Sequence, residues 1–349
     1  MRPASGPLRV AQVGLGRIGA FHANTLAHRV PQAELAMVVD ADAARAEHAG
    51  ARFGVPWSTR FEDVLTESDI GAVLIASPTP LHAEMVEGAA KAGKHIFCEK
   101  PLALDPQRAD DALAAVGRAG VLFQIGFHRR FDPDFLTVKE RIADGSIGDI
   151  RFFRATCRDM KAPSIDYLKS CGGIFADVTL HDFDVARWLL GEVDELYATG
   201  AALSDPAIAE LAGDVDNAVV ALRFRNGALG LIDNSRASGY GYEASLEVMG
   251  SRSTVRVGPV AQRVTGVETL SDASHRSDVG TDFVIRFAEG YVGAVAAFVT
   301  AVLVGRQPSP SGEDAVAAFS LAQAAQLSMI ENRPITLPTA SHRGDWPQL

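Results

Sequence analysis

The sequence predicts an α/β domain followed by an α+β domain whose sheet is mostly antiparallel. In the first part of the chain, short apolar strands alternate with amphipathic helices, and three spaced glycines follow the first strand. In the second half, strands of alternating apolar and polar residues follow one another across tight turns. A chain of 349 residues exceeds what one hydrophobic core usually serves. We therefore expect one domain over 1–128 and a second over 129–349.

The overall composition is that of a globular protein with an acidic balance. The chain is 47% hydrophobic and 22% charged, and its 33 Lys and Arg against 43 Asp and Glu give a net charge of −10. This excess of negative charge argues against nucleic acid or an anionic membrane as a partner and favours a small neutral ligand. Three cysteines without a Cys-x-x-Cys pair, no signal-peptide pattern and no apolar run of about 20 residues predict a cytoplasmic protein.

The first strand, 8–13, leads into a G-x-G-x-x-G motif, and a helical pattern follows through Leu26. In this setting the first glycine makes the turn, the second lets the backbone approach a pyrophosphate, and the third lets helix and strand pack closely. The free N–H groups and the dipole of the helix attract the phosphates. We expect dinucleotide contacts in the loop and first helical turn at Gly14, Gly16, Arg17, Ile18 and Gly19.

A carboxylate follows the second predicted strand. Strand 35–39 ends in Asp40, which comes about 20 residues after Gly19, the separation expected for the acid that binds the adenosine ribose. Asp42 adds a second negative charge and no Arg directly follows Asp40, so the 2′-phosphate of NADP would be repelled. These residues predict NAD rather than NADP. The alternative role of Asp40 is that of a simple helix cap.

The alternation of strands and helices continues through the first domain. We expect strands at 72–76, 95–98 and 121–126 and helices at 81–92 and 105–118. Ligands of such parallel sheets bind beyond the carboxyl ends of the strands. Polar side chains stand at two of these ends, at Ser77 and Thr79 and at Glu99 and Lys100. A lysine in a half-buried cleft has a lowered pKa and can act as acid, base or hydrogen-bond donor.

The second half predicts a sheet with helices on one face. Asn226-Gly227 is a strong hairpin signal between two alternating strands. The open face of such a sheet favours self-association, and we expect a homo-oligomer. The predicted strands are 150–156, 218–224, 228–234, 246–249 and 253–257, and the predicted helices are 133–143, 282–304 and 313–331.

A further amphipathic helix is predicted between Gly172 and Gly191. Asp177 and His181 stand four residues apart in it, which puts a carboxylate and an imidazole on one face. A carboxylate that holds one imidazole nitrogen leaves the other free to move a proton near neutral pH. A solvated surface pair is the alternative interpretation.

These motifs, in this order and at about these distances, resemble the Gfo/Idh/MocA oxidoreductase family over nearly the whole chain. The motif that includes Ser77, Thr79 and His82, and the Glu99-Lys100-Pro101 motif, carry the resemblance together with the glycine loop, Asp40 and the Asp177 and His181 pair. The resemblance implies a Rossmann domain that binds NAD, with His82 in its cofactor site, and a homotetramer. It also implies catalytic roles for Lys100, Asp177 and His181.

Longer segments are similar to the members of this family that oxidise inositols. They are 158–170, 172–184 and 232–242. This similarity implies oxidation of myo-inositol at C2 to its 2-keto form. His128 stands where relatives usually have Met or Asn, which leaves scyllo-inositol, other inositols and pyranose sugars as alternative substrates. By position against the family pattern, the candidate substrate residues are His128, Arg129, Asp159, Thr179, Tyr240 and Tyr242.

For the mechanism, we expect His181 to act as the general base, Asp177 to orient it and Lys100 to stabilise the reacting oxygen. Lys100 as the base is an alternative that the sequence leaves open. An NAD-dependent glycosidase and a non-catalytic sugar sensor are alternatives from other classes. No His, Cys or Glu cluster has zinc-ligand spacing, so we expect no metal.

Overall fold

The computed structural model describes residues 6–258 and 282–338. The chain divides into two compact units, Met1–Phe131 with Glu289–Val316, and Asp132–Ala288 with Ala317–Leu349. The first boundary falls close to the expected 128/129. Residues 289–316, which we expected in the second domain, instead pack with the first unit.

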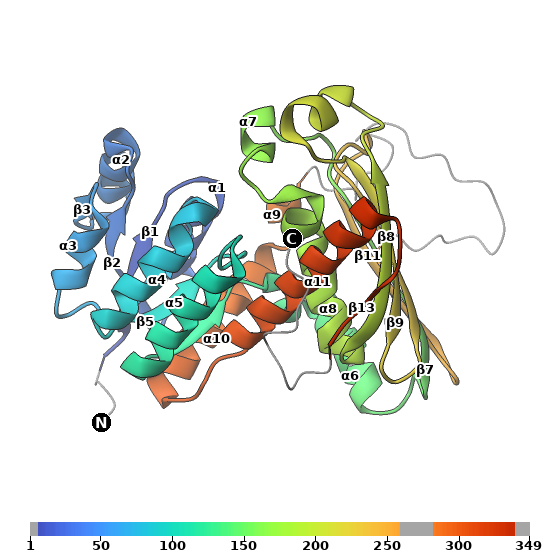
Figure 1. Cartoon of the computed structure of the whole chain (residues 1–349). Coiled ribbons are helices and arrows are strands. Elements are labelled where there is room, and N and C mark those ends of the chain that lie inside the picture. Colours follow the sequence, from blue (N-terminus) through green and yellow to red (C-terminus); the bar gives the residue numbers. More distant parts are fainter. Residues whose placement is uncertain (1–5, 259–281, 339–349) are drawn as a thin grey trace. The chain divides into compact units, whose positions relative to one another are not determined.

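The first unit contains a six-stranded parallel sheet (Figure 1). Its strands are β1 (Leu8–Val13), β2 (Ala33–Val39), β3 (Trp57–Ser58), β4 (Ala72–Ile75), β5 (His95–Cys98) and β6 (Phe123–Ile125). The spatial order is β3-β2-β1-β4-β5-β6, and every neighbouring pair is parallel. This is the strand order of a Rossmann fold, with its switch point between β1 and β4. The prediction of a doubly wound first domain is confirmed.

Helices connect these strands. They are α1 (Arg17–His28), α2 (Ala43–Phe53), α3 (Phe61–Thr66), α4 (His82–Lys91) and α5 (Pro106–Ala119), with short 3₁₀ turns η1 (Thr79–Leu81) and η2 (His128–Phe131). Local chemistry explains their ends. The Asp105 side chain caps α5 by accepting the Gln107 N–H, Pro106 fills the first turn, and Gly120 ends the helix with φ 66°.

Helix α10 (Ala288–Val304) packs on the first unit although it comes late in the chain. Val295 and Phe298 on this helix are buried in the same core cluster as Val10 and Phe97. The Gln124 amide of β6 also donates to the Ala294 carbonyl at 3.0 Å. The helix is apolar on most of its circumference, so it requires a buried position rather than the surface of a half-covered sheet.

The second unit contains a seven-stranded sheet. Its strands are β7 (Ile150–Arg158), β8 (Val193–Ala201), β9 (Asn217–Phe224), β10 (Leu229–Ser235), β11 (Glu243–Gly250), β12 (Thr254–Val257) and β13 (Ile335–Thr336), in the order β12-β11-β7-β10-β9-β8-β13. All neighbouring pairs are antiparallel except β10 with β7. The predicted hairpins around Gly227 (φ 88°) and between β11 and β12 are present. Strands β8 and β13 were not anticipated.

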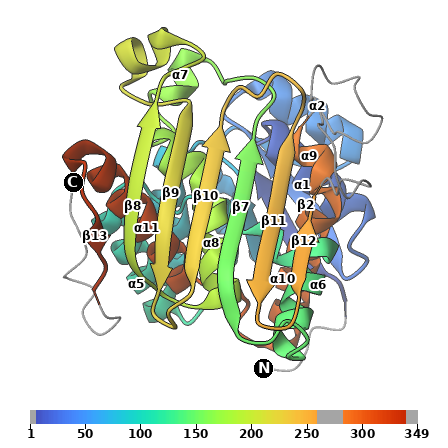
Figure 2. The same ribbon diagram turned by 90° about the vertical axis from the view of Figure 1, so that its right-hand side faces the viewer.

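The helices of the second unit are α6 (Pro133–Ala143), α7 (Ile165–Leu168), α8 (Leu180–Leu190), α9 (Phe283–Arg286) and, from Ala317 on, α11 (Gly312–Glu331), with π-helical segments η3 (Phe175–Thr179) and η4 (Ile208–Ala212). Figure 2 shows the strands from β8 to β12 toward the viewer, with α8 and α11 behind them. The prediction of helices on one face of a mostly antiparallel sheet is confirmed.

Two predicted helices differ in detail. The helix expected over 282–304 is divided at Phe287, where φ −110° and ψ 20° interrupt α9 before α10 begins. The helix expected between Gly172 and Gly191 contains the π-helical segment η3 before α8. A π turn holds more residues than an α turn, so η3 changes the direction in which the side chains of this segment point.

Candidate functional site

The glycine loop lies between β1 and α1 in the first unit. A Cβ on Gly14 (φ 84°) would lie 2.4 Å from the Ala76 carbonyl oxygen, and one on Gly19 would lie 1.9 Å from the Gly14 oxygen. Both glycines are therefore required by the packing of the chain itself. A Cβ on Gly16 would meet nothing within 4 Å, and Gly16 caps α1 without a side-chain hydrogen bond. This opening at a helix N-terminus fits a bound pyrophosphate.

Asp40 is tied to this loop. Its carboxylate accepts the N–H of Leu15 at 2.7 Å and of Asp42 at 2.9 Å, and Arg45 lies 3.4 Å from it. The residue that caps α2 is Asp42, which accepts the N–H groups of Ala44 and Arg45. The alternative of Asp40 as the helix cap is thus not what the structure shows. Arg17 and Ile18 open α1 next to the loop.

His82 connects the loops that follow β4 and β5. Its Nδ1 lies 2.8 Å from the Pro101 carbonyl oxygen and its Nε2 lies 2.8 Å from the Ser77 carbonyl oxygen. Burial lowers the pKa of His82, against the two carbonyls that favour its charged form. The side chain is buried, so His82 holds these two loops together and does not present its ring to the surface. Thr79 is the first residue of η1, in the connection between β4 and α4.

The Glu99 carboxylate holds the turn that carries Lys100. One oxygen lies 2.8 Å from His22 Nε2, and the other accepts the Lys100 backbone N–H at 3.3 Å. Gly126 makes room for this carboxylate, because a Cβ there would lie 2.9 Å from it. The Lys100-Pro101 peptide bond is cis, and Lys100 is partly exposed.

His128 and Arg129, expected to contact the substrate, lie in η2 and are almost completely buried. The His128 ring stacks on Tyr291 of α10, with ring centroids 4.0 Å apart and planes 20° apart. The His128 ring therefore packs against an aromatic side chain of the first unit itself.

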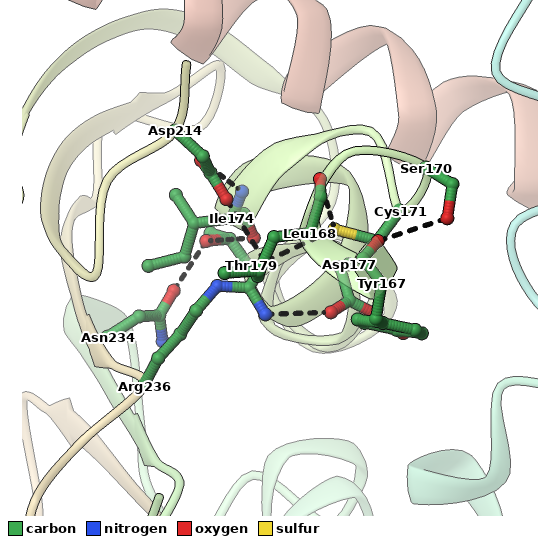
Figure 3. A network of polar contacts seen from close by, with 10 residues as sticks. All are labelled: Tyr167, Leu168, Ser170, Cys171, Ile174, Asp177, Thr179, Asp214, Asn234 and Arg236. Atoms are coloured by element: carbon green, nitrogen blue, oxygen red, sulfur yellow. Dashed lines mark hydrogen bonds and ion pairs between the residues drawn. The ribbon is translucent and has the colours of Figure 1, made fainter. Parts of the chain in front are cut away.

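Asp177 and His181 lie in the second unit, on η3 and in the first turn of α8. Both side chains are partly exposed. Asp177 Oδ1 accepts the Tyr167 hydroxyl at 2.9 Å, and Asp177 Oδ2 accepts Arg236 Nη1 at 2.9 Å (Figure 3). The orientation of the Asp177 carboxylate is thus set by residues outside its own helix.

The other expected substrate residues have different environments. Thr179 is completely buried, and its hydroxyl donates to Asn234 Oδ1 at 2.5 Å. Tyr242 is 7% exposed and packs edge to face against Phe283 and Phe287. Asp159 and Tyr240 are partly exposed, and the hydroxyl of Tyr240 donates to Glu243. The pKa of Tyr240 is raised, chiefly by burial and to a smaller extent by the Glu243 carboxylate.

Three further residues contact the expected ones and were not identified from the sequence: His22, Tyr167 and Arg236. Asp214, also not identified, contacts Arg236. His22 stands three residues after the last glycine of the loop, on the buried side of α1, which is a signal that the spacing does carry. Arg236 directly follows an alternating strand, but nothing local indicates that it is buried.

The described ranges, 6–258 and 282–338, contain no group of three or more His, Cys, Asp or Glu side chains arranged to hold a metal ion. No helix within the same ranges has the length and apolar character that a bilayer crossing requires.

Comparison with known proteins agrees with the two units. Residues 8–127 match the model of the GFO_IDH_MocA oxidoreductase family, described as an NAD-binding Rossmann fold, and residues 135–256 match that of the GFO/IDH/MocA C-terminal domain. The fold and the loop thus define an NAD-binding oxidoreductase. The chain belongs to the Gfo/Idh/MocA family.

Individual relatives are similar over nearly their whole length. The chain is 39% identical to a myo-inositol 2-dehydrogenase of Thermotoga maritima, over 95% of this chain and 98% of the relative. It is 37% identical to a scyllo-inositol 2-dehydrogenase (NAD(+)) of Bacillus subtilis, over 95% and 96%. A solved structure of scyllo-inositol dehydrogenase from Lactobacillus casei, with NAD(H) and scyllo-inositol, aligns with TM-score 0.84 and 28% identity over 95% of this chain and 99% of that one.

Proposed function

We propose that this chain oxidises myo-inositol at C2 to 2-keto-myo-inositol with NAD as the acceptor. The observation that carries the proposal is the Asp177 carboxylate, oriented by two hydrogen bonds and followed one turn later by a partly exposed imidazole, His181. It occurs in a member of an NAD-binding oxidoreductase family. The substrate class is supported by relatives named for myo-inositol and scyllo-inositol.

In the proposed reaction, His181 takes the proton of the reacting hydroxyl group. Asp177 stabilises the imidazolium that forms, and Lys100 donates a hydrogen bond to the reacting oxygen while negative charge develops on it. NAD, when bound, accepts the hydride from the substrate carbon. The competing assignment gives the role of base to Lys100 and leaves His181 to hold the hydroxyl.

NAD would be held by the glycine loop and the residues around it. The opening over Gly16 at the start of α1 receives the pyrophosphate, and Asp40 binds the adenosine ribose. The strand-end residues Ser77, Thr79, Glu99 and Lys100 complete this site, with His82 as the support of two loops.

A neutral ring polyol needs several hydrogen-bonding groups rather than one large charge, and a site that pairs hydroxyls rejects analogues that lack them. We retain the partly exposed Asp159 and Tyr240 as candidate substrate contacts, and the almost completely buried His128 and Arg129 as residues that shape the site. Thr179 and Tyr242 are buried in packing and hydrogen bonds of the second unit, and we assign them to its structure.

The test is NADH absorbance after the purified protein is mixed with NAD and one polyol at a time. The panel is myo-inositol, scyllo-inositol, D-chiro-inositol and glucose, with the Asp177→Asn protein as the matched control. Turnover of myo-inositol with the highest kcat/KM is the expected result. Higher kcat/KM for another polyol would move the substrate assignment, and release of reducing sugar from a glycoside without net NADH would replace the dehydrogenase by a hydrolase.

A further inference from the structure

Arg236 directly follows β10, and its side chain has 0% exposure. Its backbone N–H donates to the Asp216 carbonyl at 2.8 Å, which fixes the point from which the side chain extends. Taking a guanidinium out of water is costly unless other groups compensate its charge. A completely buried Arg therefore indicates partners for which the charge matters.

Two carboxylates and a thiol surround this guanidinium (Figure 3). Nη1 lies 2.9 Å from Asp177 Oδ2, and Nη2 lies 3.5 Å from Asp214 Oδ2 and 3.6 Å from Cys171 Sγ. Burial, the largest single cause, would lower the pKa of Arg236, but Asp177, Cys171 and Asp214 together outweigh it and the pKa is raised. Burial raises the pKa of the Cys171 thiol, which leaves the two carboxylates as the charged partners.

The same contacts determine where Asp177 points. Arg236 holds one of its oxygens and the Tyr167 hydroxyl holds the other, so both oxygens of the carboxylate have fixed donors. Asp214 in turn accepts the Ile174 N–H at 3.0 Å, at the residue just before η3. Arg236 thus bridges two carboxylates: that of Asp177, and that of Asp214, which holds the residue just before the segment η3 that contains Asp177.

Stability alone does not explain an Arg in this position. Replacing a buried ion pair by apolar residues of similar volume is often neutral or stabilising, because the desolvation of the charges is avoided. Without a cation, two neighbouring carboxylates cannot both stay ionised at low cost, and one of them takes up a proton. The buried guanidinium keeps Asp177 in the form that an orienting acid needs.

We propose that Arg236 is a positioning residue for proton transfer: it keeps Asp177 ionised and in one orientation, so that Asp177 stabilises the imidazolium formed when His181 takes a proton. The inference rests on the proposed function for the identity of the base. Among the described residues, the titratable and charged groups beside Asp177 include Tyr167, Cys171 and Arg236. Asp214 contacts Arg236, and His181 lies one turn further along the chain from Asp177.

Kinetics on the full chain with NAD and the polyol that it oxidises provide the first test. We expect Arg236→Gln to lower kcat by about tenfold or more, and to move the acid limb of the kcat/KM profile to lower pH, because that limb reports the pKa of the base. Arg236→Lys, which retains the charge, should recover most of the loss and the native profile. If Arg236 acts through Asp177, the double variant Arg236→Gln/Asp177→Asn is no slower than Asp177→Asn alone.

A measurement without substrate separates this inference from the proposed reaction. The imidazole of His181 is titrated by proton NMR, with its signal assigned by its loss in His181→Gln. We expect Arg236→Gln to lower the pKa of His181 by about half a unit or more, because less negative charge then stabilises the imidazolium. Arg187→Gln is the control, because Arg187 pairs with Glu192 at the other end of α8.

Tyr167→Phe covers the case in which Arg236→Gln does not fold, since the Tyr167 ring is exposed and only its hydroxyl is lost. It should lower kcat a few fold and shift the His181 titration in the same direction. Native titration of His181 in Arg236→Gln, or in Tyr167→Phe where Arg236→Gln does not fold, together with a native kcat, would overturn the inference. Absence of turnover with every polyol would count against the proposed function alone, and the NMR titration would still decide the role of Arg236.

Discussion

His181 lies in the first turn of α8 and is partly exposed, whereas the carboxylate that precedes it by four residues is bound through both oxygens. This combination of a fixed acid and an accessible imidazole is what general-base catalysis requires. We expect His181→Ala to lower kcat by about 10²-fold with little change in the Kd for NAD. Steady-state kinetics and NADH fluorescence titration measure the two quantities. An unchanged kcat would transfer the role of base to Lys100.

His22 is a second single residue with a large expected effect, in this case on stability. It is 0% exposed, lies 2.8 Å from the Glu99 carboxylate and packs edge to face on Phe97 and Tyr291. We expect His22→Leu to lower the free energy of unfolding by about 1–3 kcal/mol, because the buried carboxylate loses a partner.

His22→Gln is the matched control for that experiment, because its amide can still donate to Glu99. Urea denaturation should show it to be more stable than His22→Leu. Equal stabilities of the two variants would show that packing, and not the hydrogen bond, is what His22 contributes.

At the scale of the elements, the junction of β1 and α1 contains two kinds of glycine. Gly19 is required by the chain, because a Cβ would lie 1.9 Å from the Gly14 oxygen, while the space at Gly16 is open. We expect Gly16→Ala to weaken NAD binding by about tenfold or more at an unchanged Tm, since the methyl group would occupy the place of the pyrophosphate. Gly19→Ala should lower Tm. A stable Gly19→Ala protein, or native NAD affinity in Gly16→Ala, would contradict this division.

The loops after β4 and β5 share His82, and this contact predicts a pH dependence of stability. Burial holds the pKa of His82 below the ordinary 6.5 that the ring regains in the unfolded chain. Below pH 6.5 the unfolded chain therefore binds more protons than the folded one, so stability is full above this value and is lost as the pH falls toward the folded-state pKa.

His82→Gln tests this dependence. Urea denaturation between pH 7.5 and pH 5, at roughly half-unit steps, should show a shallower decline in the variant than in the native protein. His28→Gln is the control for the effect of replacing an imidazole by an amide, because His28 is exposed. Native stability that rises as the pH falls would mean that the two carbonyl partners of His82 outweigh its burial.

At the scale of the whole molecule, one face of the second unit's sheet remains uncovered by the helices of that unit (Figure 2). Apolar side chains are exposed on its strands, at Tyr197, Val219, Leu229 and Met249. Exposed apolar side chains on the open face of a sheet favour association with a second copy. We propose a homotetramer built through this face.

Sedimentation equilibrium at micromolar concentration should give about four times the chain mass of 37.0 kDa. Val219→Arg should produce smaller species, because it replaces an exposed apolar side chain on this face by a charged one. Leu203→Arg, at an exposed position outside the strands, is the control and should leave the mass unchanged. A native protein of monomeric mass would exclude the tetramer.

Much of the fold could be predicted from local patterns. Five of the six strands of the first unit, all except β3, the start of the helix at Asp105 and the hairpin at Gly227 follow from steric and hydrogen-bonding rules that act over a few residues. The division at Phe287 and the π segment η3 could not be predicted, because periodicity over short segments does not distinguish one regular helix from an interrupted one.

The sequence by itself determined the nucleotide loop, the acid at Asp40, the Lys100 turn and the spacing of Asp177 and His181, since each depends on neighbouring residues. Only the tertiary structure decided that Arg236 meets Asp177 across 59 residues, that α10 joins the first unit and that β7 pairs in parallel with β10. These contacts depend on which surfaces are buried together when the chain compacts, and no local pattern specifies the partner of a buried charge or an apolar helix.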